Sequence, residues 1–166
     1  MRTLLPVRRL TLFVLTAAAC TTTGEPQNAG NQQASVTHND VDYTATTLIL
    51  ESFPVQLHTT VDVVNRGRAR ARLDFRNGCK VLLRAYRTEA REQAVWDQGR
   101  VVGCTQAVET IELQPGERRQ LTARADARQI LGDSLPDGRY FLGAYLPATG
   151  GAIEMPAGAA DLAVPR

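Results

Sequence analysis

The sequence predicts an all-β fold, an antiparallel β-sandwich, for residues 42–166. In this part apolar and polar residues alternate, which is the period of a strand with one buried face. Turn-forming pairs such as Asn77-Gly78 and Pro115-Gly116 separate the alternating stretches at the spacing of sandwich strands. The 166 residues are 43% hydrophobic and 22% charged, the composition of an ordinary folded domain.

The strands are expected in the following order. The first alternating stretch has its apolar face on Leu57, Thr59, Val61 and Val63. The second places Ala69, Ala71, Leu73 and Phe75 opposite Arg68, Arg70, Arg72 and Asp74. Further strands are predicted over residues 81–86, 94–96, 110–113, 120–123, 140–145 and 160–164. Residues 126–131 predict a single helical turn, and residues 146–158, rich in Gly, Ala and Pro, predict a loose hairpin loop.

Residues 1–19 have the three parts of an export signal. Arg2, Arg8 and Arg9 precede a continuous apolar stretch over residues 10–19, which ends in small residues. The stretch is shorter than the ~20 residues that a membrane-spanning helix needs. Removing residues 1–19 takes away three of the 19 basic residues and none of the 17 acidic ones, and changes the formal charge from +2 to −1. That balance excludes nucleic-acid binding by bulk charge.

Residues 17–20 resemble the bacterial lipobox, in which small residues precede a cysteine that receives a lipid. The match departs from the usual pattern at Ala17, where the lipobox generally has Leu. The resemblance implies that Cys20 becomes a lipidated N-terminus and attaches the chain to a membrane. The alternative is cleavage after Ala19, which leaves a free thiol. Thr21 resembles the sorting pattern for an outer membrane, so the expected location is the cell envelope, facing the periplasm where the source has two membranes.

The two remaining cysteines predict a disulfide. Cys79 and Cys104 are an even number in an oxidising compartment. A metal site would need more ligands, and His38 and His58 are the only histidines in the sequence. We therefore expect no metal and a disulfide that stabilises the fold by roughly 3.5 kcal/mol.

Residues 20–41 predict a lipidated cysteine followed by a flexible spacer. Almost nothing in this stretch is apolar, so it has little to bury. The charged cluster at residues 38–42 resembles a metal site only in part, and a charged edge before the first strand is the preferred interpretation. The expected domains are residues 1–19, 20–41 and 42–166.

The order of motifs in the domain resembles the BsuPI-type intracellular proteinase inhibitor domain. The motifs lie at residues 63–67, 72–78, 83–86, 95–97, 105–108, 113–117 and 136–140. The resemblance covers about residues 45 to 146 and implies an immunoglobulin-like sandwich that binds a protease. This chain departs from the family in its export leader and in its cysteines. No inhibitory loop can be carried over residue by residue.

Catalytic residues are not evident, so an enzyme is not expected. His58 is the only histidine of the domain and lies on the polar face of its strand. The sequence has no nucleophile elbow, P-loop or dinucleotide fingerprint, and no cofactor is expected. Glu89 and Glu92 belong to a polar stretch that faces water. Trp96 is expected to pack in the core, with a binding role as the alternative.

An arginine series, Arg66, Arg68, Arg70 and Arg72, is the most unusual surface feature. In a strand these side chains project from one face, about 6.6 Å apart. They would bind anionic lipid, lipopolysaccharide or an acidic partner, and the combined changes Arg68→Glu and Arg70→Glu would then abolish a salt-dependent affinity. The preferred interpretation is a charged strand that resists edge-to-edge aggregation, and anion binding is the alternative.

The leading hypothesis is a cell-envelope lipoprotein that carries a protein-binding, proteinase-inhibitor-like β-sandwich. Its partners would be the membrane, through the lipid, and a protease or another envelope protein. The rival is a structural or assembly module of the envelope without a protease target, and the third hypothesis is anion binding through the arginines. Residues 88–93 and 146–158 are the candidate recognition loops.

Overall fold

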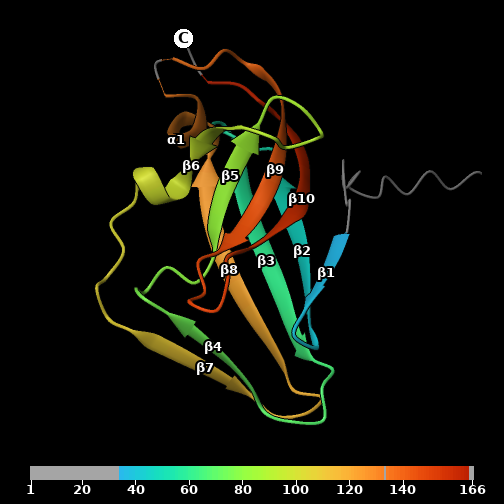
Figure 1. The fold of residues 1–166 in the computed structure, drawn as a ribbon. Helices are drawn as coiled ribbons and strands as arrows, with labels where there is room; N and C mark the ends of the chain where they lie inside the picture. The colour runs from blue at the N-terminus through green and yellow to red at the C-terminus, as the bar shows by residue number, and fades with distance from the viewer. Residues whose placement is uncertain (1–33, 133, 165–166) are drawn as a thin grey trace, which may run out of the picture.

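The computed structural model describes residues 34–132 and 134–164, which form two antiparallel sheets packed as a sandwich (Figure 1). One sheet has the order β1-β2-β3-β8, from Ala34–His38, Val41–Leu50, Gln56–Asn65 and Arg118–Asp126. The other has the order β10-β9-β5-β6, from Ile153–Leu162, Gly138–Leu146, Leu82–Tyr86 and Ala94–Asp97. β4 (Ala71–Phe75) and β7 (Glu109–Leu113) form a separate pair. The prediction of an all-β antiparallel sandwich is confirmed.

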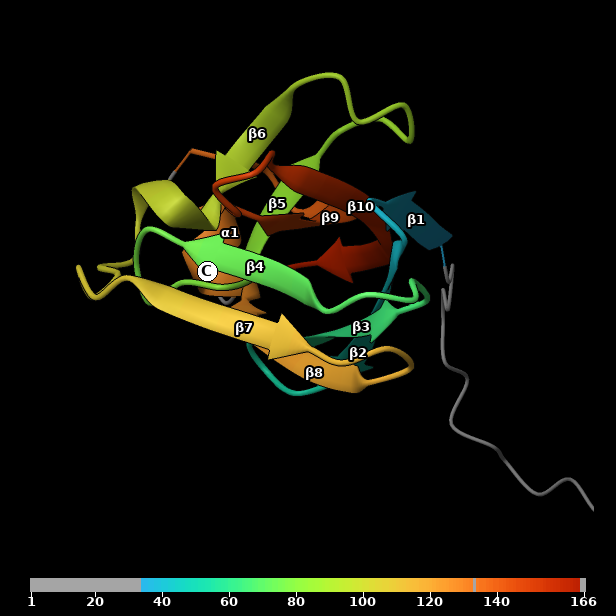
Figure 2. The same cartoon turned by 60° about the horizontal axis from the view of Figure 1, so that its bottom comes forward.

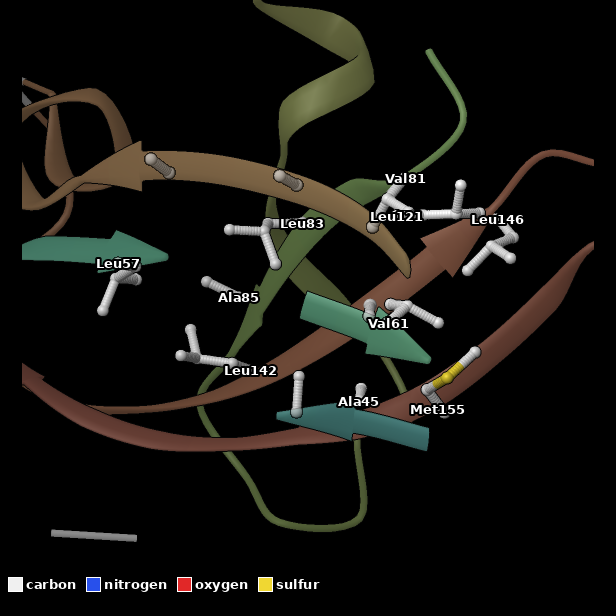
Figure 3. Close-up of a cluster of buried hydrophobic side chains, with 14 of the residues drawn as sticks. Ala45, Leu57, Val61, Val81, Leu83, Ala85, Leu121, Leu142, Leu146 and Met155 are labelled. Carbon is white, nitrogen blue, oxygen red and sulfur yellow. The ribbon is translucent and has the colours of Figure 1, made fainter. Parts of the chain in front are cut away.

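The core lies between the inner faces of the two sheets. In β3 every second residue from Leu57 to Asn65 is buried, which is the alternation that the sequence predicts. Figure 3 shows Leu57 and Val61 from one sheet near Leu83, Leu142 and Met155 from the other. These side chains are 0–1% exposed, so the sandwich is held by apolar burial on both inner faces.

The C-terminal part of the predicted spacer is ordered as a strand. Ala34–His38 form β1, which pairs along β2 from Ala34 with Ala45 to His38 with Val41. Asn39 and Asp40 both have positive φ, 50° and 59°, as the two central residues of a tight hairpin turn require. The low apolar content of the segment does not prevent pairing, because the main chain of β2 supplies the hydrogen-bonding partners.

Two further expectations differ from the structure. The strand predicted from Ala69 begins at Ala71, because residues 66–70 have no partner strand and form the β3–β4 loop. The loose loop predicted over residues 146–158 is strand β10 from Ile153 onward, pairing with β9 through a bulge after Pro156. The bulge accommodates Gly158, whose φ is 98°.

The predicted helical turn is confirmed as α1 (Ala127–Leu131). The carboxylate of Asp126 accepts the main-chain N–H of Gln129 at 2.8 Å, and the Gln129 side chain accepts the N–H of Asp126 at 3.2 Å. This reciprocal pair is a capping box. Ile130 and Leu131 are buried beneath it.

Removing this cap is expected to destabilise the fold modestly. Asp126→Ala leaves the Gln129 N–H without its acceptor and lowers the free energy of unfolding by about 1 kcal/mol. Urea unfolding followed by circular dichroism measures the change. Glu51→Ala, at an exposed loop position, is the control and should leave the midpoint unchanged.

Candidate functional site

The two loops predicted for recognition lie at opposite ends of the sandwich. In the antiparallel register, Tyr86 at the end of β5 pairs with Phe141 near the start of β9. The loop after β5 (residues 87–93) therefore leaves from the end at which β9 begins. The β9–β10 loop (residues 147–152) lies at the other end (Figure 1). A single partner surface cannot be formed by these two loops together.

The β5–β6 loop is exposed but tied to the sheet through Arg91. The Arg91 side chain donates to the carbonyls of Leu142 at 3.1 Å, Glu89 at 2.9 Å and Gly158 at 3.5 Å. Its main-chain N–H donates to the Thr88 carbonyl at 3.2 Å, which closes a turn at the tip. Arg91 thus holds the loop against the sheet through hydrogen bonds to main-chain carbonyls.

The β9–β10 loop borders a cavity of about 390 Å³. His38, Arg70, Arg72 and Gly151 are among the residues around it. The loop is held by Thr149, whose N–H and hydroxyl donate to the Asp74 carbonyl at 2.8 and 3.1 Å. The cavity is formed at the junction of the β1–β2 turn, β4 and this loop.

The arginine series does not form one strand face. Arg66 and Arg68 lie in the β3–β4 loop, Arg70 at its end and Arg72 in β4. Arg66 pairs with Asp42 at 3.0 Å, Arg70 with Glu112 at 3.0 Å and Arg72 with Asp74 at 2.9 Å. Among the residues described, Arg68 is the one of the four that has no carboxylate partner.

Asn65 shapes this arginine-bearing loop. Its side-chain amide donates to the carbonyls of Ala69 at 2.8 Å and Leu113 at 2.9 Å, and its amide oxygen accepts the Gly67 N–H at 2.9 Å. Asn65 is 1% exposed. Because this buried amide bonds to three main-chain groups, the chain turns after β3 and does not continue as a strand.

The acidic partners of these arginines predict how stability depends on pH. The Thr37 hydroxyl and Arg66 hold the pKa of Asp42 below its ordinary value of 3.8. The Thr110 hydroxyl and Arg72 do the same for the pKa of Asp74. A carboxyl with a lowered pKa in the folded state stabilises the fold above its unfolded pKa, and that stability is lost as the pH falls through the folded pKa.

We expect the unfolding temperature to be nearly constant from about pH 8 to 5 and to fall below about pH 4. Asp42→Asn should lower the unfolding temperature at neutral pH and have a smaller effect near pH 2, because the wild-type carboxyl becomes protonated as the pH falls through its lowered pKa. Thermal unfolding across this pH range measures both. An equal effect of Asp42→Asn at both pH values would contradict this assignment.

A third exposed segment lies between the 3-10 turn η1 (Gln98–Arg100) and β7. Residues 101–108, called the 101–108 segment below, run along the left side of the molecule in Figures 1 and 2. Cys104 in this segment is bonded to Cys79 with an S–S distance of 2.00 Å, so the predicted disulfide is formed. The exposed fractions of Val101 and Val108 are 60% and 74%. The segment therefore presents apolar side chains to solvent while one of its residues is covalently fixed.

The start of the 101–108 segment is fixed by Gln98. The Gln98 carbonyl accepts the N–H groups of Val101 and Val102, both at 3.0 Å. Its side chain is 7% exposed and bridges the two sheets, accepting from Leu83 N–H at 3.0 Å and donating to the Arg124 carbonyl at 2.6 Å. Gln98 thus connects the segment to the sandwich.

A charged cluster on the outer face of the second sheet is a closed network. Arg84 pairs with Asp97 at 2.9 Å and with Glu154 at 2.7 Å, and its guanidinium lies 3.8 Å from the Tyr145 ring centre. The Tyr86 hydroxyl bonds to Glu154. Burial and this bond raise the pKa of Tyr86. Because these groups bind one another across the four strands β6, β5, β9 and β10, the cluster braces the sheet.

The other residues singled out in the sequence take structural positions. His58 is half-buried in β3, opposite Leu48 and Arg124 on the neighbouring strands. Glu89 and Glu92 are exposed in the β5–β6 loop. Trp96 is 8% exposed within the core, as predicted. Tyr86 and Tyr140 are buried, and Tyr145 is half-buried. Cys20 and the export signal lie outside the described residues.

Residues 34–132 and 134–164 contain no group of three or more His, Cys, Asp or Glu side chains that would hold a metal ion. In the same ranges no helix has the length and apolar character needed to cross a membrane.

The sequence contains a family motif at residues 105–108 but indicates no role for it. Two signals in the sequence point to it: the motif directly follows a disulfide cysteine, and it precedes the strand at 109–113 without an intervening turn pair. Neither signal predicts that the side chains face solvent, because Val101, Ala107 and Val108 are apolar residues of types that are often buried.

The sequence matches the family model of BsuPI, described as intracellular proteinase inhibitor, over residues 45–151. No curated protein matches the sequence.

Similar solved structures include a β-glucosidase from Erythrobacter marinus, with 13% identity, a TM-score of 0.38, and coverage of 71% of this chain and 15% of that one. A β-glucosidase from Listeria innocua has 12% identity and a TM-score of 0.38, covering 71% and 16%. A β-glucosidase from Kluyveromyces marxianus has 10% identity and a TM-score of 0.39, covering 71% and 15%. This chain spans about one sixth of their length, and these TM-scores are too low to establish a common fold.

Proposed function

We propose that this chain, which belongs to the BsuPI family of intracellular proteinase inhibitors, acts at the cell envelope as a lipid-anchored protein that binds and blocks a protease. The family match favours an inhibitor over an enzyme. Family membership alone does not fix the partner, because one fold serves many functions.

The observation that best supports protease binding is that the 101–108 segment is both exposed to solvent and held in place. It is exposed along its length, with Val102 and Cys104 only half-buried, and the disulfide and Gln98 hold it in place. A segment that is already ordered loses little conformational entropy on binding, so more of its contact energy appears as affinity. Inhibition needs such a segment, because a mobile one is cleaved as a substrate.

Anchoring is supported by the sequence around Cys20 and by the position of β1. The first described residue, Ala34, pairs with Ala45 on β2. Thirteen residues separate Cys20 from Ala34. A chain of this length reaches at most about 50 Å, so a lipid on Cys20 would keep the domain close to the membrane. Cys20→Ser should abolish incorporation of labelled palmitate and release the protein from membranes, whereas Thr21→Ser should not.

The proposed inhibition is tested by titration. The full-length chain, purified in detergent with its disulfide intact, is added to a panel of serine proteases that includes a subtilisin-type enzyme. We expect residual activity to fall to zero near one equivalent, with the inhibitor intact on a gel. An undigested chain that inhibits no protease of the panel would contradict the proposal and favour a structural role in the envelope.

A further inference from the structure

We propose that Gln106, Ala107 and Val108 enter the active-site cleft of the target protease, and that the Gln106 side chain occupies the pocket that selects the substrate residue. This assignment rests on the proposed function and adds the contact residues and the uncharged character of the selecting pocket. It involves reversible binding only, with no bond formed or broken.

The three residues lie between two fixed points. On one side, the Thr105 carbonyl accepts the Gly78 N–H at 2.9 Å, next to the Cys79–Cys104 disulfide. The Thr105 hydroxyl packs so closely on Gly78 that a Cβ at position 78 would clash with it. On the other side, Glu109 begins β7, where it pairs with Phe75 in register.

Glu109 is fixed by its side chain as well, because its carboxylate contacts Lys80 at 2.5 Å. Lys80 follows Cys79 directly, so both ends of the three-residue stretch are attached to the same short piece of chain after β4. The stretch is therefore fixed at both ends and lies on one side of the sandwich (Figure 2). Because both ends are fixed, the stretch loses less conformational entropy on binding than a free loop would.

The main chain between these points is free to bind a partner. Within the described part of the chain, Gln106 and Ala107 make no hydrogen bond. Proteins that bind a peptide as an added strand do so by pairing with its N–H and C=O groups. The neighbouring Val108 adds an apolar side chain that is 74% exposed. These are the groups that a substrate-binding cleft uses.

Gln106 is the residue suited to the selecting pocket. Thr105 is excluded, because its carbonyl and hydroxyl are already engaged with Gly78. Ala107 offers only a methyl group. Gln106 has a free main chain and a long, uncharged side chain that is exposed. The selecting pocket of the partner protease is therefore uncharged, and the partner is not a protease that selects Lys or Arg.

The β5–β6 loop fits a cleft less well, although it is also exposed. Its tip is a closed turn through the Arg91 N–H and the Thr88 carbonyl. The side chain of Arg91 is turned inward onto the Leu142 carbonyl. This loop therefore serves as the control site for the experiment.

The test changes the selecting side chain. Gln106→Arg in the full-length oxidised chain should create inhibition of trypsin at least about 100-fold stronger than that of the wild type, and weaken inhibition of the subtilisin-type protease at least about 10-fold. The control, Ala90→Arg, adds the same side chain to the β5–β6 loop and should change neither value. Both variants should unfold at the wild-type temperature.

The outcomes separate this inference from the proposed function. If the wild type inhibits a protease and Gln106→Arg shifts neither inhibition constant, the assignment of residues 106–108 is wrong and the proposed function stands. Rapid cleavage of Gln106→Arg by trypsin without inhibition also overturns the assignment. If the wild type and both variants inhibit no protease, the proposed function fails, and this inference with it.

Discussion

Removing the disulfide should cost the chain about 3.5 kcal/mol of stability and most of its inhibitory strength. Cys79→Ala with Cys104→Ala opens a link between residues 25 positions apart. The unfolded chain then regains the entropy that the closed loop removes, which corresponds to a loss of about 3.5 kcal/mol. For a domain of this size the unfolding temperature should fall by about 10–15 °C.

The effect on binding has a separate cause. Without the disulfide, the 101–108 segment is held next to Gly78 only by the hydrogen bond to the Thr105 carbonyl. Its conformational entropy in the free protein increases, so binding should weaken by about 10-fold or more at temperatures where the variant is folded.

Denaturant unfolding and inhibition titrations at low temperature measure the two effects. Wild type treated with a reducing agent should behave like the double variant, and the double variant should not respond to the reagent. A loss of less than about 1 kcal/mol would show that the loop-closure account does not apply to this domain.

Gln98→Leu should be the most damaging single change outside the apolar core. Leucine has nearly the size of glutamine but has no polar atoms in its side chain. The Leu83 N–H and the Arg124 carbonyl, which the Gln98 amide joins at 3.0 and 2.6 Å, would lose their partner between the sheets. Leaving two such groups unpaired costs about 2–4 kcal/mol in total.

The matched control is Gln93→Leu, at an exposed glutamine of the β5–β6 loop, which should change stability by less than about 0.5 kcal/mol. Gln98→Glu adds a second test. The carboxylate can accept from Leu83 but cannot donate to the Arg124 carbonyl, so this variant should be destabilised at neutral pH and partly recover when Glu is protonated. Equal stability of Gln98→Leu and wild type would contradict the bridging role.

Local pattern was sufficient to predict the strands that bury one face. The alternation in β3, the helical turn at α1 and the pairing of Cys79 with Cys104 were all predicted. Each depends on information that is local in the sequence: the period of apolar side chains, a short run of residues without turn formers, or the count of cysteines in an oxidising compartment. The family resemblance was likewise evident from motif order and is confirmed over residues 45–151.

Where hydrogen-bonded pairing with a neighbouring strand sets the end of a strand, the sequence pattern alone did not predict that end. β1 forms because the edge of β2 accepts it, although its own sequence is polar. The alternating stretch at residues 66–70 is a loop because β7 ends its pairing with β4 at Ala71 and the Asn65 amide turns the chain. β10 extends through Pro156 because β9 provides a long partner and a bulge accommodates the irregularity.

For the candidate site too, some features follow from the sequence and others only from the tertiary structure. The sequence by itself determined the sandwich, the disulfide and the motif at residues 105–108. Only the tertiary structure decided that Gln106, Ala107 and Val108 face solvent between two fixed ends, while the arginine series is largely paired with carboxylates. The physical reason is that exposure and ion pairing depend on groups distant in the sequence, such as Gly78, Glu112 and Asp42, which are brought together only when the sheets pack.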